Sequence, residues 1–221
     1  MQAIFVVMEA GEIDLNHVLQ QQAKVPNESK SSSLSSLNIN FIRLTWQQML
    51  GAVYSIHEER IIHGDLKPAN FLFVRGALKL IDFGIAKAIQ SDDTTNIYRE
   101  NTIGTLNYMA PEAILESETG SANARVKLGR ASDIWSLGCI LYQMVYGQTP
   151  FASLKNMIRK LRAIIDPQHE IPFPSEYKVD SSAVDAIKQC LQRNPDNRPP
   201  IVSTQKHQIG LLNSHCFLHS G

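Results

Sequence analysis

Two short segments of the chain combine residue types that could handle a phosphoryl group. One reads HGDLKPAN and begins at His63, and the other reads DFG and begins at Asp82. Phosphoryl transfer asks a protein mainly for positioning and for stabilisation of negative charge. Asp65 could accept a hydrogen bond from an incoming hydroxyl, and Lys67 could reach the transferred phosphate as a point charge. Asp82 and the carboxamide of Asn70 could supply the hard oxygen ligands that Mg²⁺ prefers.

The order of these residues matters more than any one of them. A lone aspartate is more often a helix cap or a surface charge, and a lone lysine is usually solvated. Here further short segments follow the two loops in a fixed order: Gly104-Thr105, Ala110-Pro111-Glu112, Asp133-x-Trp135-x-x-Gly138 and Arg198. The whole series, from about residue 4 to residue 200, resembles the eukaryotic protein kinases.

The elements that must position these residues can be predicted from periodicity. Apolar residues at spacings of three and four indicate helices, and short β-branched or aromatic runs bounded by turn residues indicate strands. The predicted strands are Ile4–Met8, Phe71–Val74 and Leu78–Ile81, with a turn at Arg75-Gly76 between the last two. The predicted helices are Ile13–Gln22 with Asp14 as its cap, Ile42–Ile56, Asp133–Tyr146 ended by Gly147, Leu154–Ile165 and Val184–Leu191.

One predicted helix carries two distinct faces. Its apolar residues recur from Leu154 through Ile158 and Leu161 to Ile165, which predicts a stripe that faces the core. The charged residues within Lys155–Arg162 would then lie on the opposite face. They could form a docking surface for a partner, or simply a solvated face.

Composition indicates one ordinary globular domain. The 221 residues are 43% hydrophobic and 19% charged, and 21 basic residues balance 21 acidic ones. This balance does not favour nucleic acid or an acidic membrane as a partner. The few cysteines, Cys139, Cys190 and Cys216, indicate a reducing compartment and form no zinc pattern. The apolar run Ala3–Met8 is too short to span a membrane, so nucleus or cytoplasm is expected.

A closer resemblance appears in several longer stretches. Gly104-Thr105 and the DLKPAN segment are typical of serine/threonine kinases. The stretches MEAGEIDL, DLKPANFL, LKLIDFGIA, WSLGCILYQMVYGQTPF and LRAIIDPQHEI resemble the monopolar spindle kinase family, also called TTK. That family comprises dual-specificity checkpoint kinases that act at kinetochores. The IIDPQHEI segment is the most specific of these signals, because general kinase chemistry does not require it.

The resemblance implies roles for individual residues. The backbone of Glu9 and Gly11 would bind adenine as a hinge, with Met8 as gatekeeper and Leu72 as the floor of the pocket. For Met8 and Leu72, plain core packing is the alternative. Thr105 would line the substrate pocket and contact Asp65. The remaining residues would be structural: His63 in the catalytic loop, Gly84 beside the metal, the ion pair of Glu112 with Arg198, and Asp133, which would hold the catalytic-loop backbone or cap its own helix.

One position departs from the common kinase pattern. Gly64 stands where many kinases place an arginine that receives the activation-loop phosphate. Phosphates in the loop after the DFG segment would therefore need another basic partner, and we expect phosphorylation there not to act through residue 64. The candidate phosphate acceptors and basic partners are Thr94, Thr95, Thr102, Lys87 and Arg99.

The expected fold is mainly α, of the α+β class: a kinase-like C-terminal lobe with small β-hairpins at the catalytic site. We expect residues 1–11 to be a remnant strand and hinge, residues 12–200 the lobe with a serine-rich insertion at 26–40, and residues 201–221 an atypical tail. No GxGxxG segment or strand lysine precedes the catalytic loop, which predicts an absent N-terminal lobe.

The expected function follows from the resemblance. The chain would transfer the γ-phosphate of ATP, with Mg²⁺, to hydroxyl groups of protein substrates. Kinetochore partners, and a location at the kinetochore or spindle, are implied by the family alone. Because the parts that cover the phosphates are missing, weak or absent catalysis is predicted. The alternative is a catalytically inactive fragment that serves as a binding or scaffold module.

Overall fold

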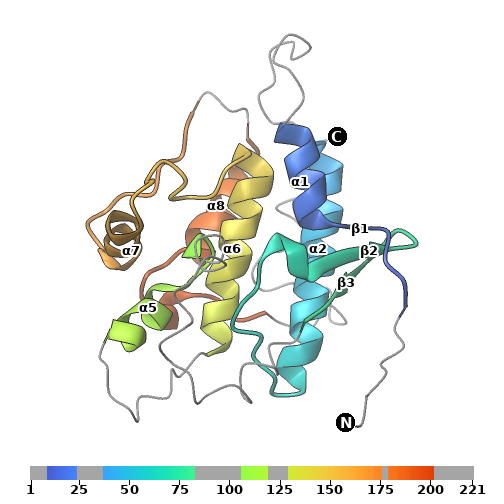
Figure 1. Ribbon diagram of the computed structural model, residues 1–221, viewed down its shortest axis with the longest axis horizontal. Coiled ribbons are helices and arrows are strands. Elements are labelled where there is room, and N and C mark those ends of the chain that lie inside the picture. The colour runs from blue at the N-terminus through green and yellow to red at the C-terminus, as the bar shows by residue number, and fades with distance from the viewer. Residues whose placement is uncertain (1–8, 24–36, 83–105, 119–128, 176–178, 202–221) are drawn as a thin grey trace, which may run out of the picture.

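The computed structural model describes residues 9–23, 37–82, 106–118, 129–175 and 179–201. It is mainly helical, with one small antiparallel sheet at one side, so the expected fold class is confirmed (Figure 1). The predicted strand Ile4–Met8, the serine-rich segment up to residue 36 and the tail after residue 201 lie outside the described residues.

The core is built around one helix, α6 (Arg130–Tyr146). Nearly all of its side chains are buried, including Trp135, Leu137 and Ile140, which are 0% exposed. A helix that is buried all round must be covered by neighbours on every side. Helices α2 (Ile39–Glu58) and α8 (Ser181–Cys190) pack directly against it. Helix α6 ends as predicted, because Gly147 takes the left-handed conformation that favours glycine.

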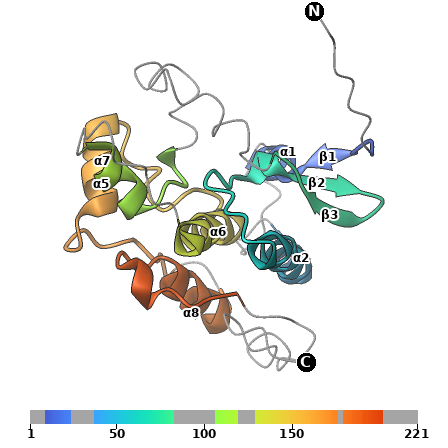
Figure 2. The same ribbon diagram turned by 90° about the horizontal axis from the view of Figure 1, so that it is seen from below.

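The remaining elements lie on two sides of this core. Figures 1 and 2 both place α5 (Pro111–Glu118) and α7 (Met157–Ile165) on one side of α6, and α2 with the sheet on the other. Short 3₁₀ turns in the described part of the chain lie at Pro68–Asn70 in the catalytic loop and at Pro195–Asn197 just before Arg198. No helix among the described segments is both long and apolar enough to cross a membrane.

The sheet has the order β1–β2–β3 and is antiparallel throughout. The hairpin of β2 (Phe71–Val74) and β3 (Ala77–Leu80) confirms the predicted strand pair to within one residue. Its two turn residues, Arg75 and Gly76, both have positive φ, as the tight hairpin turn requires. This hairpin carries the chain from the catalytic loop directly to the DFG segment.

Near the start of the chain, the predicted helix boundary moves by two residues. Ile13 and Asp14 form the short strand β1, which pairs with β2, and helix α1 runs over Leu15–Ala23. Asp14 caps this helix as predicted: its Oδ1 accepts a hydrogen bond from the His17 amide at 2.8 Å. A two-residue strand exists only because a partner strand is present, which a local pattern cannot reveal.

The helix predicted at Leu154–Ile165 differs from the observed α7 in where it begins and in the exposure of Ile158. Helix α7 begins after Asn156, whose side chain caps it, so Leu154 lies outside the helix. The buried residues of α7 are Lys160, Ala163 and Ile164, and Leu161 and Ile165 are partly buried against the core. Ile158, in contrast, is 59% exposed. The prediction is therefore wrong at Ile158, whereas Leu154, Leu161 and Ile165 pack against the core as predicted. Lys160, expected on the charged outer face, is buried.

The close approach of α6 and α8 gives a first testable prediction. A Cβ added at Gly138 would lie 2.5 Å from the Cβ of Cys190 and 3.1 Å from Leu191 Cδ2, so the two helices would have to separate. We expect Gly138→Ala to lower the free energy of unfolding by about 1–3 kcal/mol, measured by urea denaturation.

Gly51, within α2, offers the matched control. A Cβ there would meet no atom within 4 Å. Gly51→Ala should therefore raise the free energy of unfolding by up to about 1 kcal/mol, through helix propensity alone. A Gly138→Ala protein as stable as the parent would contradict the tight packing.

Candidate active site

One buried carboxylate anchors the start of the catalytic loop. Asp133, in the first turn of α6, is 0% exposed. Its Oδ2 accepts a hydrogen bond from the His63 amide at 3.0 Å, and its Oδ1 accepts one from the Gly64 amide at 2.9 Å. The sequence left two roles open for Asp133: holding the catalytic loop or capping its own helix. Its observed contacts are with the loop, and the N-cap position of α6 is occupied by Gly129. The carboxylate fixes where the loop begins.

His57 supports this carboxylate from the end of α2. The side chain of His57 is only 6% exposed, and its Nε2 lies 2.7 Å from Asp133 Oδ2. Because a carboxylate only accepts hydrogen bonds, the ring nitrogen is the donor. Sequence reasoning missed this residue. It belongs to no motif, and its partner lies 76 residues away along the chain. No local pattern in the sequence could have pointed to it.

Gly64 has a positive φ of 73° within this anchored loop. The left-handed region favours glycine, because other residues meet a steric penalty there. Glycine, in place of the arginine that many kinases carry here, therefore suits the backbone conformation of residue 64. The activation-loop residues named as phosphate acceptors or basic partners lie outside the described residues.

Asp65 and Lys67, which follow Gly64 in the loop, form an ion pair. Lys67 Nζ lies 3.0 Å from Asp65 Oδ2, and the two side chains are 31% and 12% exposed. The Asn70 side chain folds back on the same turn, where its Oδ1 accepts a hydrogen bond from the Lys67 amide at 3.1 Å. The carboxylate, the ammonium and the carboxamide are therefore held within one short, partly buried turn.

The chain just before the DFG segment lies directly beside this turn. The Ile81 amide donates to the Asn70 carbonyl oxygen at 2.8 Å, and the Ile81 carbonyl lies 3.4 Å from His63 Nε2. His63 Nδ1 in turn lies 3.3 Å from the Asp65 amide, so the buried ring spans both segments. Asp82 follows at once, exposed and with a φ of 60°. The hairpin thus returns Asp82 to the loop that carries Asp65.

The residues assigned to the hinge lie at the edge of the same sheet. Glu9 and Gly11 are exposed, and the following Glu12 amide donates to the Phe73 carbonyl at 2.9 Å. Gly11 lies against Leu72: a Cβ added at Gly11 would come within 2.0 Å of Leu72 Cδ2. The two segments therefore touch where a base pocket is expected. Met8, Gly84 and Thr105 lie outside the described residues.

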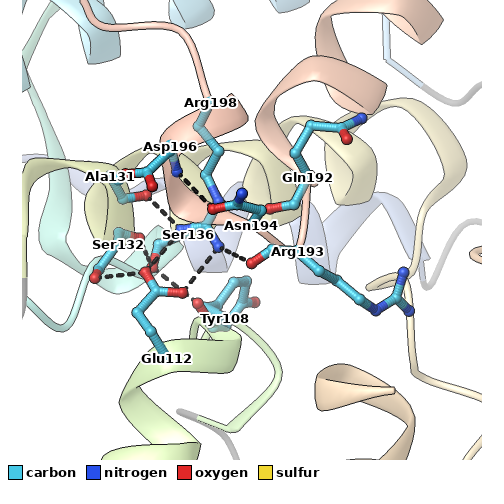
Figure 3. A network of polar contacts seen from close by, with 10 residues as sticks. All are labelled: Tyr108, Glu112, Ala131, Ser132, Ser136, Gln192, Arg193, Asn194, Asp196 and Arg198. Atoms are coloured by element: carbon cyan, nitrogen blue, oxygen red, sulfur yellow. Dashed lines mark hydrogen bonds and ion pairs between the residues drawn. The ribbon is translucent and has the colours of Figure 1, made fainter. Parts of the chain in front are cut away.

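A second polar network, away from the loop, fixes the end of the described chain (Figure 3). Arg198 approaches Glu112 with both guanidinium nitrogens, at 2.7 and 2.8 Å, and its side chain is 0% exposed. The same guanidinium lies over the ring of Trp135 at 5.1 Å. Burial alone raises the pKa of Glu112, but the hydrogen bonds and charge of Arg198 outweigh it, so this pKa lies below its ordinary value.

Backbone and hydroxyl groups complete the network. Arg198 also donates to the carbonyl oxygens of Ala131, Gln192 and Arg193, and the Ser132 hydroxyl donates to Glu112 Oε1 at 2.8 Å (Figure 3). One side chain therefore joins α5, the start of α6 and the segment after α8. The network is structural, since it holds the helix that carries Asp133.

The donor set at the loop fits a magnesium–nucleotide complex. Asp82 presents an exposed carboxylate, and Asn70 Oδ1 uses one lone pair on the Lys67 amide, which leaves a second lone pair. Mg²⁺ is commonly bound by one or two protein oxygens together with phosphate oxygens. In the described part of the chain, no three His, Cys, Asp or Glu side chains form a metal cage of their own. The nucleotide would complete the coordination.

Comparison with known proteins agrees with this geometry. The chain is 56% identical over 206 residues to "Probable serine/threonine-protein kinase mps1" of Dictyostelium discoideum, an alignment that covers 93% of this chain and 20% of that protein. It is 49% identical to "Serine/threonine-protein kinase mph1" of Schizosaccharomyces pombe, covering 91% and 31%, and 46% identical to "Dual specificity protein kinase TTK" of Mus musculus, covering 97% and 24%.

The chain thus spans between a fifth and a third of the length of these relatives. The family model described as "Protein kinase domain" matches residues 1–209, which include the loop anchored by Asp133, the Asp65–Lys67 pair and the DFG segment. With its high identity to the Mps1 and TTK kinases, the chain belongs to the protein kinase domain family.

Proposed function

We propose that this site transfers the γ-phosphate of ATP to serine or threonine hydroxyls of proteins, and to tyrosine as the name of the dual-specificity relative suggests. The observation that supports it best is the geometry of the catalytic turn. Asp65 is partly buried beside Lys67. The loop that carries both is hydrogen-bonded to Asp133 of α6 and to the Ile81 amide, which directly precedes the DFG segment.

In this mechanism the chain positions groups and stabilises charge. Asp65 accepts the hydrogen bond of the substrate hydroxyl and orients it towards the phosphate. Lys67, already held 3.0 Å from Asp65, balances negative charge that develops on the transferred group. Asp82 and Asn70 would hold Mg²⁺, which when bound neutralises charge on the phosphate oxygens. The backbone of Glu9 and Gly11, with Leu72 below, would hold the adenine.

We propose further that turnover by these 221 residues alone is weak. They contain no GxGxxG segment, whose backbone covers the phosphates in protein kinases. Losing even one preorganised donor can cost on the order of 10²–10³ in kcat. A role at the kinetochore or spindle, in the nucleus or cytoplasm, is proposed from the resemblance to the Mps1 and TTK kinases.

The test separates nucleotide binding from turnover. We expect Mg²⁺–ATP at saturating concentration to raise the melting temperature of the chain, because a ligand of the native state at 100 times its Kd adds about 2.7 kcal/mol. Asp82→Asn should abolish most of this shift. Asp65→Asn should leave the shift intact but remove any transfer of radiolabelled phosphate to a serine peptide.

Asp185, an exposed aspartate on α8, provides the matched control. Asp185→Asn should change neither the shift nor the transfer. A nucleotide shift without any transfer, even at high protein concentration, would favour the binding-module alternative. The absence of a shift in the parent chain would count against nucleotide binding, and transfer that survives Asp65→Asn would overturn the assigned role of Asp65.

A further inference from the structure

Helix α7 exposes an isoleucine and buries a lysine, the reverse of what folding alone favours. Ile158 is 59% exposed, more than any other large apolar side chain in the described part of the chain. Lys160, two residues later, is 9% exposed. Each arrangement is unfavourable: an exposed isoleucine forfeits its burial energy, and a buried ammonium loses hydration. Departures of this kind are expected where function competes with stability.

The buried lysine fixes the orientation of the helix. Lys160 Nζ donates to Asn107 Oδ1 at 2.6 Å, so α7 is tied to the segment that leads into α5. Helix α7 also packs against α5 itself. This hydrogen bond, together with burial of Ala163 and Ile164, holds Ile158 on the outer side. The exposure of Ile158 is therefore a property of the packed helix rather than of a loose end.

The outer side of α7 carries positive charge around that isoleucine. Ile158, Arg159 and Arg162 lie within α7, where spacings of three and four residues place side chains on one helical face, and Lys155 precedes the first helical residue by two positions. All four are exposed, and the sequence from 155 to 165 contains no acidic residue. Within the ranges that the structure describes, none of these three cations forms an ion pair.

We infer that this face, defined as Lys155, Ile158, Arg159 and Arg162, docks an acidic protein segment that carries an apolar side chain. The apolar side chain would cover Ile158, and carboxylates on either side would meet the cations. A merely solvated face would account for the three cations but not for the isoleucine among them. Charge complementarity of this kind mainly provides specificity and a fast association rate, with the apolar contact as the anchor. The inference does not depend on phosphoryl transfer.

The test is a binding measurement on the 221-residue chain at about physiological salt. The probe is a fluorescein-labelled peptide of Glu-Glu-Leu repeats, followed by fluorescence anisotropy, with a second peptide in which serine replaces each leucine. We expect saturable binding of the first peptide and at least about tenfold weaker binding of the second. Ile158→Ser and the double variant Arg159→Glu with Arg162→Glu should each weaken binding of the first peptide about tenfold.

Lys79→Glu supplies a charge-reversal control on a distant surface. Lys79 lies on β3, which both ribbon views place on the other side of α6 from α7. It is 54% exposed and pairs, among the described residues, with Glu9 at 3.8 Å. Its variant should bind the leucine peptide within about twofold of the parent. Equal weakening by Lys79→Glu, equal binding of the serine peptide, or no binding of either peptide would overturn the proposal. So would tighter, α7-dependent binding to phosphatidylserine vesicles or to duplex DNA.

Discussion

Replacing Arg198 with methionine should lower the free energy of unfolding by about 3–5 kcal/mol, because the variant leaves the partly buried Glu112 without its cation. Arg198 is 0% exposed in its side chain and holds both oxygens of Glu112 at 2.7 and 2.8 Å. Its donors also satisfy three backbone carbonyl oxygens, which methionine cannot do. Urea denaturation of parent and variant measures the loss directly.

The pH dependence of the stability loss tests whether Glu112 is the partner through which Arg198 acts. The pKa of Glu112 is lowered in the folded chain, so its stabilising contribution is fully present above the ordinary glutamate pKa and is lost as pH falls through the lower, folded value. Arg198→Met removes the two strongest causes of that depression, the hydrogen bond and the charge of Arg198. The difference in stability between parent and variant should therefore be largest near pH 7 and should shrink as pH falls towards about 4.

Arg193 provides a matched control for this dependence. It donates to the carbonyl oxygens of Ala163, Ile164 and His169, and no carboxylate among the described residues forms a hydrogen bond with it. Arg193→Met should also destabilise, but without the Glu112-linked change with pH. Adding Glu112→Leu to Arg198→Met should recover part of the loss, since it removes the unpaired charge. A loss below about 1 kcal/mol in Arg198→Met would contradict the structural role.

Replacing Asp133 with asparagine should release the start of the catalytic loop. The amide keeps one acceptor oxygen, but its NH₂ group would face donors where the carboxylate now accepts from His57, His63 and Gly64. An unsatisfied buried donor costs about 1–3 kcal/mol, and more than one is created here. We expect a loss of about 3 kcal/mol in unfolding free energy, with faster hydrogen exchange at the His63 and Gly64 amides.

The exchange measurement distinguishes a loop anchor from general support. Asp180→Asn is the control, because Asp180 caps α8 through its Oδ1 and an asparagine can keep that cap. It should leave exchange at His63 and Gly64 unchanged. If Asp133→Asn lowered stability uniformly, without selective loss of protection at those two amides, the anchoring role would be wrong.

Several features could be predicted from the sequence because they depend on near neighbours. The strand Phe71–Val74 and the turn at Arg75-Gly76 follow from residue types within a few positions, and they are confirmed. The helix end at Gly147 is confirmed for the same reason. The catalytic loop could be recognised because one continuous segment holds the Asp65–Lys67 pair.

Other features could not be predicted because they depend on which distant segments meet. The sequence left Asp133 with two possible roles, and only the packing of α2 against α6 brings His57 to its carboxylate. The exposure of Ile158 and the burial of Lys160 were predicted wrongly from the apolar spacing of α7. The competing interaction was the hydrogen bond of Lys160 with Asn107, 53 residues away, which local periodicity cannot reveal.

By itself, the sequence determined the family, the order of the catalytic segments and most of the helices and strands, since each follows from short-range spacing. The tertiary structure alone decided how the loop is anchored and which face of α7 is exposed. Buried carboxylates and cations require partners, and those partners come from whichever segments the fold brings together.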